Sequence, residues 1–274
     1  MAAQTKNNKR FKLEKWYLDG VTEEGNSFIV YASELKWHKW RITYSSILTL
    51  DQLVGISHKF KIGNCHFPEK SKALIKWQDD YFKFDGVWNG NNQSIQERLF
   101  ENSEGSLDWK CYQPSSKVSF RFKNKNHKAL GYAEKLVLTA VPWDIPMDEL
   151  RWGRFVSSEY NIVWIEYKRD QIKQWAWVNG EKVENWDITD DYVANDKMQL
   201  KLIFGEKVVL EKEKKIFNVV KTLVKFLPGF KRSVPLKFLN SDEKKWLNKS
   251  SLMIDNQRVS TGWSIHELVD FSGN

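Results

Sequence analysis

The sequence predicts an all-β protein, and three observations support this prediction. Apolar and polar residues alternate along many short segments, as expected for strands that bury one face. Asn-Gly and Asp-Gly pairs, which form tight turns, fall between such segments. The chain of 274 residues also contains 14 Trp, 16 Phe and 9 Tyr, and aromatic residues are enriched in strands. Many short strands with regular turns are typical of a β-barrel or a β-sandwich.

Two segments show the alternation clearly, "KVSFRF" at residues 117–122 and "MQLKLIF" at residues 198–204. The apolar residues that share a face are Val118, Phe120 and Phe122 in the first segment and Met198, Leu200, Leu202 and Phe204 in the second. Side chains two residues apart point to the same side of a strand, so each set predicts one buried face.

Three dipeptides predict hairpin turns, because Asn, Asp and Gly tolerate the positive φ that tight turns require. They are Asp85-Gly86, Asn89-Gly90 and Asn179-Gly180.

One segment has a different period. In "EKKIFNVVKTLVKFLPGF", apolar residues recur at helical spacing, and Pro228-Gly229 supplies a stop. The apolar positions are Ile216, Val220, Leu223 and Leu227. This pattern predicts an amphipathic helix packed on the barrel, although its β-branched residues also allow a strand. A membrane-touching helix is the alternative.

The stretch "GYAEKLVLTAVPWDIPMDELRWGRF" predicts a domain junction. Pro142 and Pro146 interrupt strand hydrogen bonding between two strand-rich halves. We therefore expect an N-terminal domain at 1–145 and a C-terminal domain at 146–274. A faint internal repeat, with Trp16 before "SFIVYASE" and Trp152 before "NIVWIEYK", indicates duplication.

The net charge of +8 is concentrated in one stretch. The stretch from Lys207 to Lys249 contains twelve Lys and Arg residues and four Asp and Glu residues. This surplus of positive charge equals the whole net charge. No nucleic-acid-binding module is recognisable, so we expect no specific nucleic-acid partner. An acidic ligand or peripheral contact with an anionic membrane fits this positive charge at least as well as a nucleic acid does. We predict that the stretch belongs to the second barrel and its flanking helix. No obligate protein partner is evident.

Other residue patterns exclude several classes of site. Cys65 and Cys111 fit no metal-ligand or disulfide framework and are expected to be reduced and partly buried. The five histidines form no ligand cluster, so we expect no metal site. No nucleotide-binding loop or nucleophile elbow is present, and we expect no cofactor. His266-Glu267 could form a proton relay, although a surface or strand-end pair is the simpler interpretation.

The N-terminal segment has no apolar core of a signal peptide, and no apolar run is long enough to span a membrane. We expect a cytoplasmic protein, peripheral to a membrane at most, unless a signal peptide is missing from the given sequence.

Three clusters resemble signatures of one protein family. Glu14-x-Trp16-Tyr17-x-x-Gly20 resembles the N-terminal signature of the carotenoid hydratase (hydroxyneurosporene synthase) superfamily. Gly131-Tyr132-x-Glu134 and Trp152-Gly153-Arg154 resemble its two junction signatures. The chain departs from the family after the second cluster, where Lys135, Leu136, Val137 and Leu138 replace His, Asn, Trp and Gly, and Glu134 replaces Asp.

This resemblance implies two tandem lipocalin-like antiparallel β-barrels, to which the pattern above adds one or two short helices. Relatives include tocopherol cyclases and lipocalin-like Diels-Alderases. The family implies a deep apolar cavity for a hydrophobic small molecule of polyene or isoprenoid type. Because of the departures, the architecture follows from the resemblance and the reaction stays open.

Glu134 is the candidate catalytic residue. A carboxylic acid in an apolar cavity can stay protonated near neutral pH and donate its proton to an alkene, carbonyl or epoxide. Candidate ligand-binding residues, several of which could face the resulting cation with a π surface, are Trp16, Tyr17, Tyr132, Trp152, Arg154 and Trp164. The structural alternative is that Glu134 pairs with Arg154 and joins the two barrels, and buried carboxylates are usually paired.

Three functional classes follow. The first is a cofactor-free enzyme that promotes cyclisation, hydration or isomerisation of a lipophilic substrate by conformational control and proton transfer. The second is a non-catalytic carrier of a hydrophobic ligand, for which the same barrel suffices. The third is a carbohydrate-binding module, which would display exposed coplanar aromatic rings. We favour the first.

Overall fold

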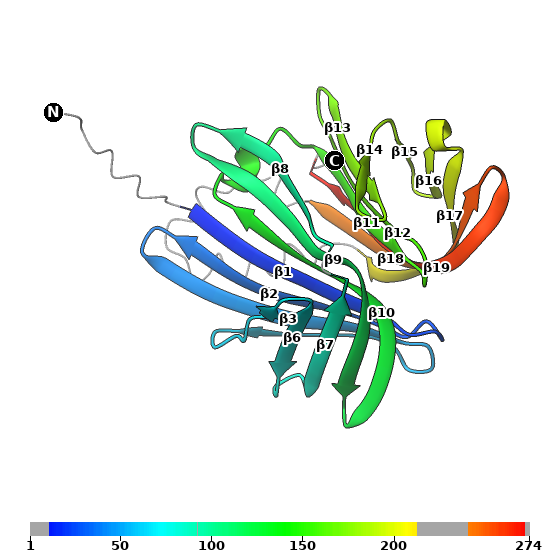
Figure 1. Ribbon diagram of the computed structural model, residues 1–274. Coiled ribbons are helices and arrows are strands. Elements are labelled where there is room, and N and C mark those ends of the chain that lie inside the picture. The colour runs from blue at the N-terminus through cyan, green and yellow to red at the C-terminus, as the bar shows by residue number, and fades with distance from the viewer. Residues whose placement is uncertain (1–10, 92, 213–240, 272–274) are drawn as a thin grey trace.

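The computed structural model contains two antiparallel β-sheets, one from each half of the chain (Figure 1). It describes residues 11–91, 93–212 and 241–271. The prediction of an all-β fold is confirmed, because the helices within these ranges are two short 3₁₀ helices, η1 (Pro142–Asp144) and η2 (Asp196–Met198). The helix predicted from Ile216 to Leu227 lies outside the described residues.

The first sheet is built from the strands that precede residue 139. They are β1 (Phe11–Val21), β2 (Ser27–Trp37), β3 (Trp40–Asp51), β4 (Gly55–Ile62), β5 (Glu69–Ser71), β6 (Leu74–Asp79), β7 (Phe84–Gly90), β8 (Ile95–Asn102), β9 (Gly105–Phe122) and β10 (Lys125–Leu138). Their order is β4-β3-β2-β1-β10-β9-β7-β6-β5, and β8 also pairs with β9. The first and last strands are therefore neighbours in the middle of the sheet.

The second sheet repeats this winding. Its strands are β11 (Glu149–Val156), β12 (Asn161–Lys168), β13 (Ile172–Val178), β14 (Glu181–Val183), β15 (Asp187–Ile188), β16 (Tyr192–Asn195), β17 (Leu200–Lys212), β18 (Asp242–Ile254) and β19 (Gln257–Asp270). Their order is β14-β13-β12-β11-β19-β18-β17-β16-β15, so β11 pairs with the last strand as β1 does. The faint internal repeat matches this topology, because Trp16 and Trp152 lie on the first strands of the two sheets.

The connection between the sheets runs from the end of β10 at Leu138 to the start of β11 at Glu149 and contains η1. Pro142 is the first residue of η1, where a missing backbone N–H costs nothing. The predicted junction falls in this connection, and the division into domains 1–145 and 146–274 stays a prediction.

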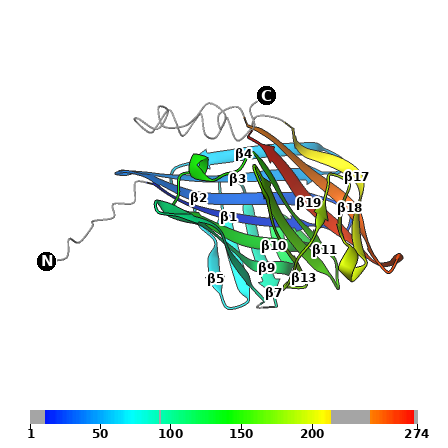
Figure 2. The same cartoon turned by 90° about the horizontal axis from the view of Figure 1, so that it is seen from above.

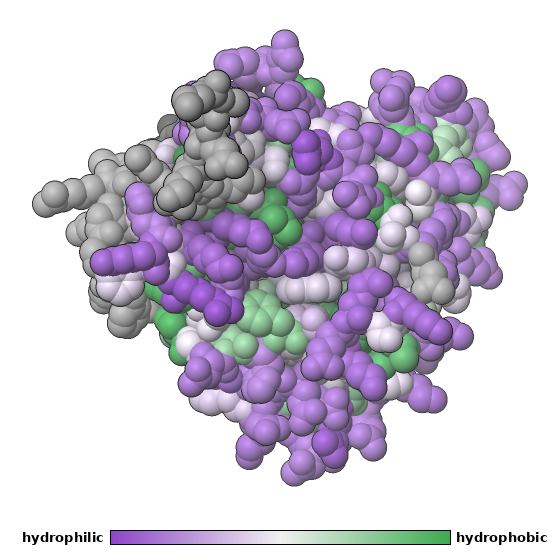
Figure 3. All heavy atoms as spheres, turned by 60° about the vertical axis from the view of Figure 1, so that its left-hand side comes forward, coloured by the Kyte–Doolittle hydropathy of each residue, from purple (hydrophilic) through white to green (hydrophobic). Residues whose placement is uncertain are grey.

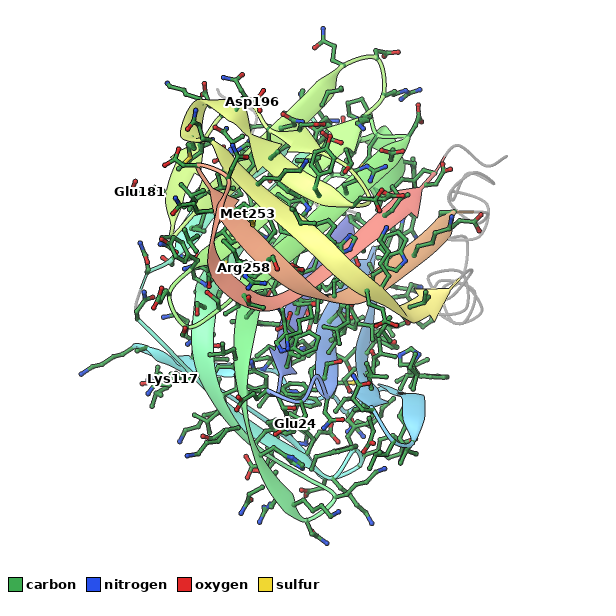
Figure 4. All side chains as sticks on the ribbon, turned by 90° about the vertical axis from the view of Figure 1, so that its right-hand side faces the viewer. Glu24, Lys117, Glu181, Asp196, Met253 and Arg258 are labelled. Atoms are coloured by element: carbon green, nitrogen blue, oxygen red, sulfur yellow. The ribbon has the colours of Figure 1, made fainter. Side chains whose placement is uncertain are left out.

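Apolar side chains fill three layers. One cluster lies within the first sheet alone and includes Trp16 and Trp88. A second lies within the second sheet alone and includes Trp164. The third, which we call the inter-sheet layer, combines side chains of both sheets, such as Tyr17 and Trp152. Figure 2 shows the two curled sheets side by side, and Figure 4 shows the second sheet, with Met253 and Arg258, above the first, with Glu24 and Lys117. The central strands are thus buried on both faces.

The predicted strand faces are largely confirmed. Val118 is buried in the first-sheet cluster, with Phe120 and Phe122 packed against it. In the second segment Leu200, Leu202 and Phe204 are buried in the second-sheet cluster. Met198 is the exception: it belongs to η2 and is 39% exposed, because the strand begins only at Leu200.

One of the three predicted hairpin turns is confirmed. Asn179 and Gly180 have φ of 51° and 82° and connect β13 to β14. Asp85-Gly86 and Asn89-Gly90 lie inside β7, so those two predictions are wrong. Gly86 makes room for aromatic rings there, since a Cβ would come within 2.7 Å of Phe84 and 2.9 Å of Trp88.

The cationic stretch begins and ends in the second sheet. Lys207 and Lys212 lie on β17, and Lys245 and Lys249 lie on β18, whereas residues 213–240 are outside the described ranges. Lys245 is fully buried, so it is not part of a cationic surface. No helix in the described part of the chain is long and apolar enough to span a bilayer.

Candidate functional site

A cavity of about 310 Å³ lies in the inter-sheet layer. Strands β1, β8, β9 and β10 line it from the first sheet, β11, β12 and β19 line it from the second, and the connection around η1 closes one side. Its volume is at the lower end of the range for small-molecule sites. The wall is mostly aliphatic and aromatic, which predicts a hydrophobic ligand.

Strand alternation decides which side chains reach the cavity. On β1, Leu13, Lys15 and Tyr17 line it, whereas the intervening Trp16 belongs to the cluster within the first sheet. On β10 the lining residues are Glu134, Leu136 and Leu138. Both sets keep the two-residue period of a strand.

Few polar groups face this space. Lys15, Glu134 and Glu267 are the charged side chains among the residues described as lining it. The hydroxyl groups of Tyr17 and Tyr167, which also line it, each donate a hydrogen bond to another protein group. A small number of polar groups in an apolar wall is typical of sites that orient a hydrophobic molecule.

Glu134 is held by two donors on one oxygen. The Tyr132 hydroxyl donates to Glu134 Oε2 at 2.5 Å, and the Trp109 indole N–H donates to the same oxygen. The second oxygen, Oε1, accepts no hydrogen bond from a described residue. The carboxyl group is therefore fixed in orientation, and Oε1 is left to carry a proton.

Burial raises the pKa of Glu134 from 4.5 to about 7. The hydrogen bonds from Tyr132 and Trp109 and the charge of Lys15 oppose this shift, and the charge of Glu267 adds to it. Since desolvation disfavours the ionised form, a large fraction of Glu134 is protonated near neutral pH.

Arg154 pairs with Asp19, so the predicted ion pair between Glu134 and Arg154 is wrong. Arg154 Nε and Nη2 donate to Oδ2 and Oδ1 of Asp19 at 2.9 and 2.7 Å, and both side chains are fully buried. Arg154 Nη1 donates to the carbonyl oxygen of Trp263 at 2.7 Å. Asp19 offers both oxygens to the guanidinium fork, which is the preferred geometry. Arg154 does join the two sheets, but through β1.

Three of the predicted site residues meet at the cavity: Tyr17, Glu134 and Trp152. The rings of Tyr17 and Trp152 lie 4.9 Å apart. The Trp152 indole N–H is buried and has no hydrogen-bond partner in the described structure. Tyr132 does not line the cavity but orients Glu134 from behind.

Two predicted site residues lie elsewhere. Trp16 stacks on Tyr112 at 5.1 Å within the first sheet. Trp164 stacks on Phe204 at 5.7 Å within the second sheet, over Gly153, where a Cβ would come within 2.2 Å of its ring. Both lie on the strand face that points away from the inter-sheet layer.

His266 and Glu267 are neighbours on β19 and point to opposite faces. His266 stacks on Phe204 and Trp246 with centroids 4.3 and 4.9 Å apart and bonds Asn248 at 2.9 Å. Burial lowers the pKa of His266 to about 3, so the ring is neutral. Glu267 lines the cavity. The two residues form neither a proton relay nor a strand-end pair.

Sequence reasoning missed three residues that support the site: Asp19, which pairs with Arg154, Trp109, which donates to Glu134, and Lys245, which pairs with the cavity residue Glu267. Trp109 alternates with polar residues in "LDWKCY" and so carried a signal of inward orientation, whereas Asp19 lies on a strand that shows no polar side and carried none. Lys245 carried none, because it lies within a run of charged residues.

Metal and thiol chemistry find little support in the described ranges. There, no group of three or more His, Cys, Asp or Glu side chains could hold a metal ion. Cys65 is partly buried and Cys111 is buried, and both are free thiols as predicted. Burial raises the pKa of the Cys111 thiol, which disfavours the reactive thiolate.

Comparison with solved structures finds this architecture in other proteins, among them the following three. An AttH-like protein from Nitrosomonas europaea aligns with a TM-score of 0.56 and 11% identity over 99% of this chain and 98% of its own. Kievitone hydratase from Nectria haematococca aligns with a TM-score of 0.52 and 12% identity over 98% and 93%. The Diels-Alderase CghA aligns with a TM-score of 0.51 and 10% identity over 97% and 90%.

The chain shares the fold of these proteins. The resemblance seen in the three sequence clusters is thus confirmed at the level of architecture. No family model and no curated protein sequence matches the chain.

Proposed function

We propose that the protein is a cofactor-free enzyme that binds a polyene or isoprenoid-type molecule in the inter-sheet cavity and promotes its cyclisation, hydration or isomerisation. The observation that carries this proposal is Glu134, a carboxyl group in an apolar cavity whose pKa burial raises to about 7. Such a group is poised to act as a general acid near neutral pH.

The geometry of Glu134 suits proton donation. Because Tyr132 and Trp109 both donate to Oε2, the proton resides on Oε1, the oxygen free of protein donors. Once the proton has been transferred, the same two donors stabilise the carboxylate that remains. The acid thus has a fixed direction of donation and a supported conjugate base.

Aromatic rings would stabilise a cation formed on the ligand. Tyr17 and Trp152 line the cavity in mutual contact, and Tyr17 is the cross-strand neighbour of Glu134. A cation over a Tyr or Trp ring gains roughly 0.5–2 kcal/mol, more when it is desolvated.

The structural neighbours support an enzymatic role. Two of the proteins compared above are enzymes, a hydratase and a Diels-Alderase. Closed apolar sites in such enzymes restrict substrate conformation, and this restriction itself lowers the barrier to ring closure.

The carbohydrate-binding alternative finds no matching surface among the residues that the structure describes. Trp40, at 42%, is the exposed tryptophan of the described residues, and the other large exposed aromatic side chains there are Phe60 and Tyr81. The face in Figure 3 is covered mainly by hydrophilic side chains. A platform of coplanar rings would be required for stacking on sugars. The carrier alternative shares the cavity and differs only in the absence of conversion.

Filling the cavity should abolish ligand binding. Leu136→Trp places an indole ring in the cavity and is expected to weaken binding of the apolar fluorophore N-phenyl-1-naphthylamine at least about tenfold, since a filled pocket removes the buried contact area. Val137→Trp is the matched control, because its side chain points to the opposite face of β10. Equal binding by both variants would place the ligand site elsewhere.

An assay of ligand conversion distinguishes an enzyme from a non-catalytic carrier. We expect the wild-type protein to convert at least one of geraniol, farnesol and geranylgeraniol. When the reaction is run in D₂O, mass spectrometry should show deuterium bound to carbon in the product. Binding of these compounds without conversion or exchange would support a carrier and contradict the enzymatic proposal.

A further inference from the structure

Glu267 faces the cavity from the sheet opposite Glu134. Its cross-strand neighbours are Trp152 on β11 and Lys245 on β18, whereas Glu134 has Tyr17 as its neighbour on β1. The rings of Tyr17 and Trp152 touch across the layer. The two carboxyl groups therefore flank one aromatic pair, one from each sheet.

Lys245 supplies Glu267 with a buried counter-charge. Its side chain is fully buried, and Nζ lies 3.0 Å from Oε2 of Glu267. Nζ also lies 2.9 Å from Glu243 Oε1 and 3.1 Å from Glu211 Oε2 and donates to the Tyr31 hydroxyl at 2.7 Å. An ammonium group in hydrogen-bonding contact stabilises the ionised form of a carboxyl group.

Glu267 is the carboxyl group of this cluster that reaches the cavity, since neither Glu211 nor Glu243 is among the residues that line it. Burial raises the pKa of Glu243. The Glu267 side chain is 17% exposed, compared with 10% for Glu243 and 8% for Glu211, so it is the most accessible of the three.

We propose that Glu267 is the general base that completes the reaction started by Glu134. The inference rests on the proposed function and adds a second catalytic residue from the other sheet. A carboxyl group whose pKa is raised by burial and a second carboxyl group in contact with an ammonium are suited to acid and base roles in one site.

The proton transfers balance as follows. Glu134 donates its proton to one carbon of a substrate double bond, and the neighbouring carbon becomes a cation over the Tyr17–Trp152 pair. Glu267 then accepts a proton from an adjacent C–H bond, and the electrons of that bond form a new double bond. The product is an isomer of the substrate, and no oxidant or reductant is consumed. In hydration, Glu267 instead accepts the proton of the water that adds to the cation.

The base can be tested without the natural substrate. The probe 5-nitrobenzisoxazole is a compact apolar molecule from which a carboxylate removes the C3 proton. The C–H electrons form a nitrile, the N–O bond breaks, and the coloured phenolate is released. At about pH 6, where Glu134 is mainly protonated, we expect Glu267→Gln to lower the catalysed rate by about 10²-fold or more.

The pH profile supplies a readout that a structural role would not change. As the pH rises through the pKa of Glu134, its carboxylate becomes a second base, so the Glu267→Gln variant should regain activity. The double variant Glu134→Gln/Glu267→Gln should stay inactive at both pH values.

Glu243→Gln is the matched control, because it removes a carboxylate from Lys245 without touching the cavity. We expect it to retain the elimination rate within about threefold, a minor effect compared with loss of a general base. Glu267→Asp keeps a counter-charge for Lys245 and should fold normally, yet lose activity because its carboxylate is withdrawn from the cavity.

An absence of catalysed elimination in the wild type, or equal losses in the Glu243 and Glu267 variants, would overturn the assignment of Glu267. Neither result bears on proton donation by Glu134, which the isoprenoid conversion assay tests separately.

Discussion

Replacing Asp19 with asparagine is expected to lower the free energy of unfolding by about 3–5 kcal/mol, because it leaves a buried guanidinium without its counter-charge. Asp19 and Arg154 are both fully buried and share two hydrogen bonds. Asparagine has only one side-chain oxygen to accept these hydrogen bonds, and it carries no charge. Since Tyr17 also donates to Asp19, at 2.9 Å, the cavity wall should loosen together with the sheet contact.

Asp85→Asn is the matched control for this prediction. Asp85 makes an ion pair with Arg121 in the same sheet at 3.6 Å, but the two side chains are 44% and 57% exposed. Exposed pairs of this kind contribute about 0–1 kcal/mol. Urea unfolding monitored by tryptophan fluorescence measures both variants, and similar midpoints for Asp19→Asn and wild type would contradict the role given to this pair.

Glu134→Gln is expected to abolish turnover while preserving the fold. The amide has nearly the shape of the carboxyl group and can still accept hydrogen bonds from Tyr132 and Trp109, but it cannot donate the required proton. Loss of a general acid lowers rates by about 10²–10⁴-fold. The effect is measured as the rate at which the variant converts, at about pH 6, the isoprenoid alcohol that the wild type converts. A rate near that of wild type would exclude Glu134 as the acid.

The stability of the same variant should depend on pH in a defined direction. A carboxyl group whose pKa is raised by folding, here from 4.5 to about 7, stabilises the fold fully below pH 4.5 and loses this contribution as the pH rises through 7. The difference corresponds to about 3 kcal/mol. Glutamine has no proton to lose, so Glu134→Gln should gain thermal stability relative to wild type between about pH 5 and pH 8.

The control for this pH dependence is Glu181→Gln. Glu181 is exposed at the start of β14 (Figure 4), so its removal should leave the difference from wild type unchanged across the same pH range. A Glu134 variant that loses stability as the pH rises would contradict the raised pKa.

The alternation of apolar and polar residues allowed strands to be predicted from the sequence wherever only one face of the strand is buried. Val118 and its neighbours in β9 show this, since the intervening residues are exposed. The Asp85-Gly86 turn could not be excluded in this way. Whether a glycine supplies a positive φ or room for a ring depends on Phe84 and Trp88, whose contacts form only in the folded sheet.

The choice between Trp16 and Tyr17 as a cavity residue could not be made from the sequence either. Strand β1 is buried on both faces, so its pattern shows no polar side, and alternation cannot tell which face meets the other sheet. The signature clusters correctly indicated strands that line the cavity. The direction of each side chain could be determined only from the order of strands in the sheets.

Partners far apart in the chain were beyond sequence reasoning. Arg154 meets Asp19 across 135 positions, and Lys245 meets Tyr31 across 214. Both contacts depend on how the two sheets face each other, and several carboxylates in the sequence were equally plausible partners. Glu134 is nearer to Arg154 in the sequence than Asp19 is, yet Asp19 lies where both guanidinium donors can be satisfied.

The pKa of Glu134 is the most direct test of the proposed chemistry, because it needs no substrate. Carboxyl ¹³C NMR of glutamate-labelled protein, with Glu134→Gln used to assign the resonance, follows the titration of this group alone. We predict a midpoint near 7, set by burial of Glu134 in the apolar cavity. A midpoint close to the ordinary value of 4.5 would show an ionised carboxylate at neutral pH and contradict proton donation by Glu134.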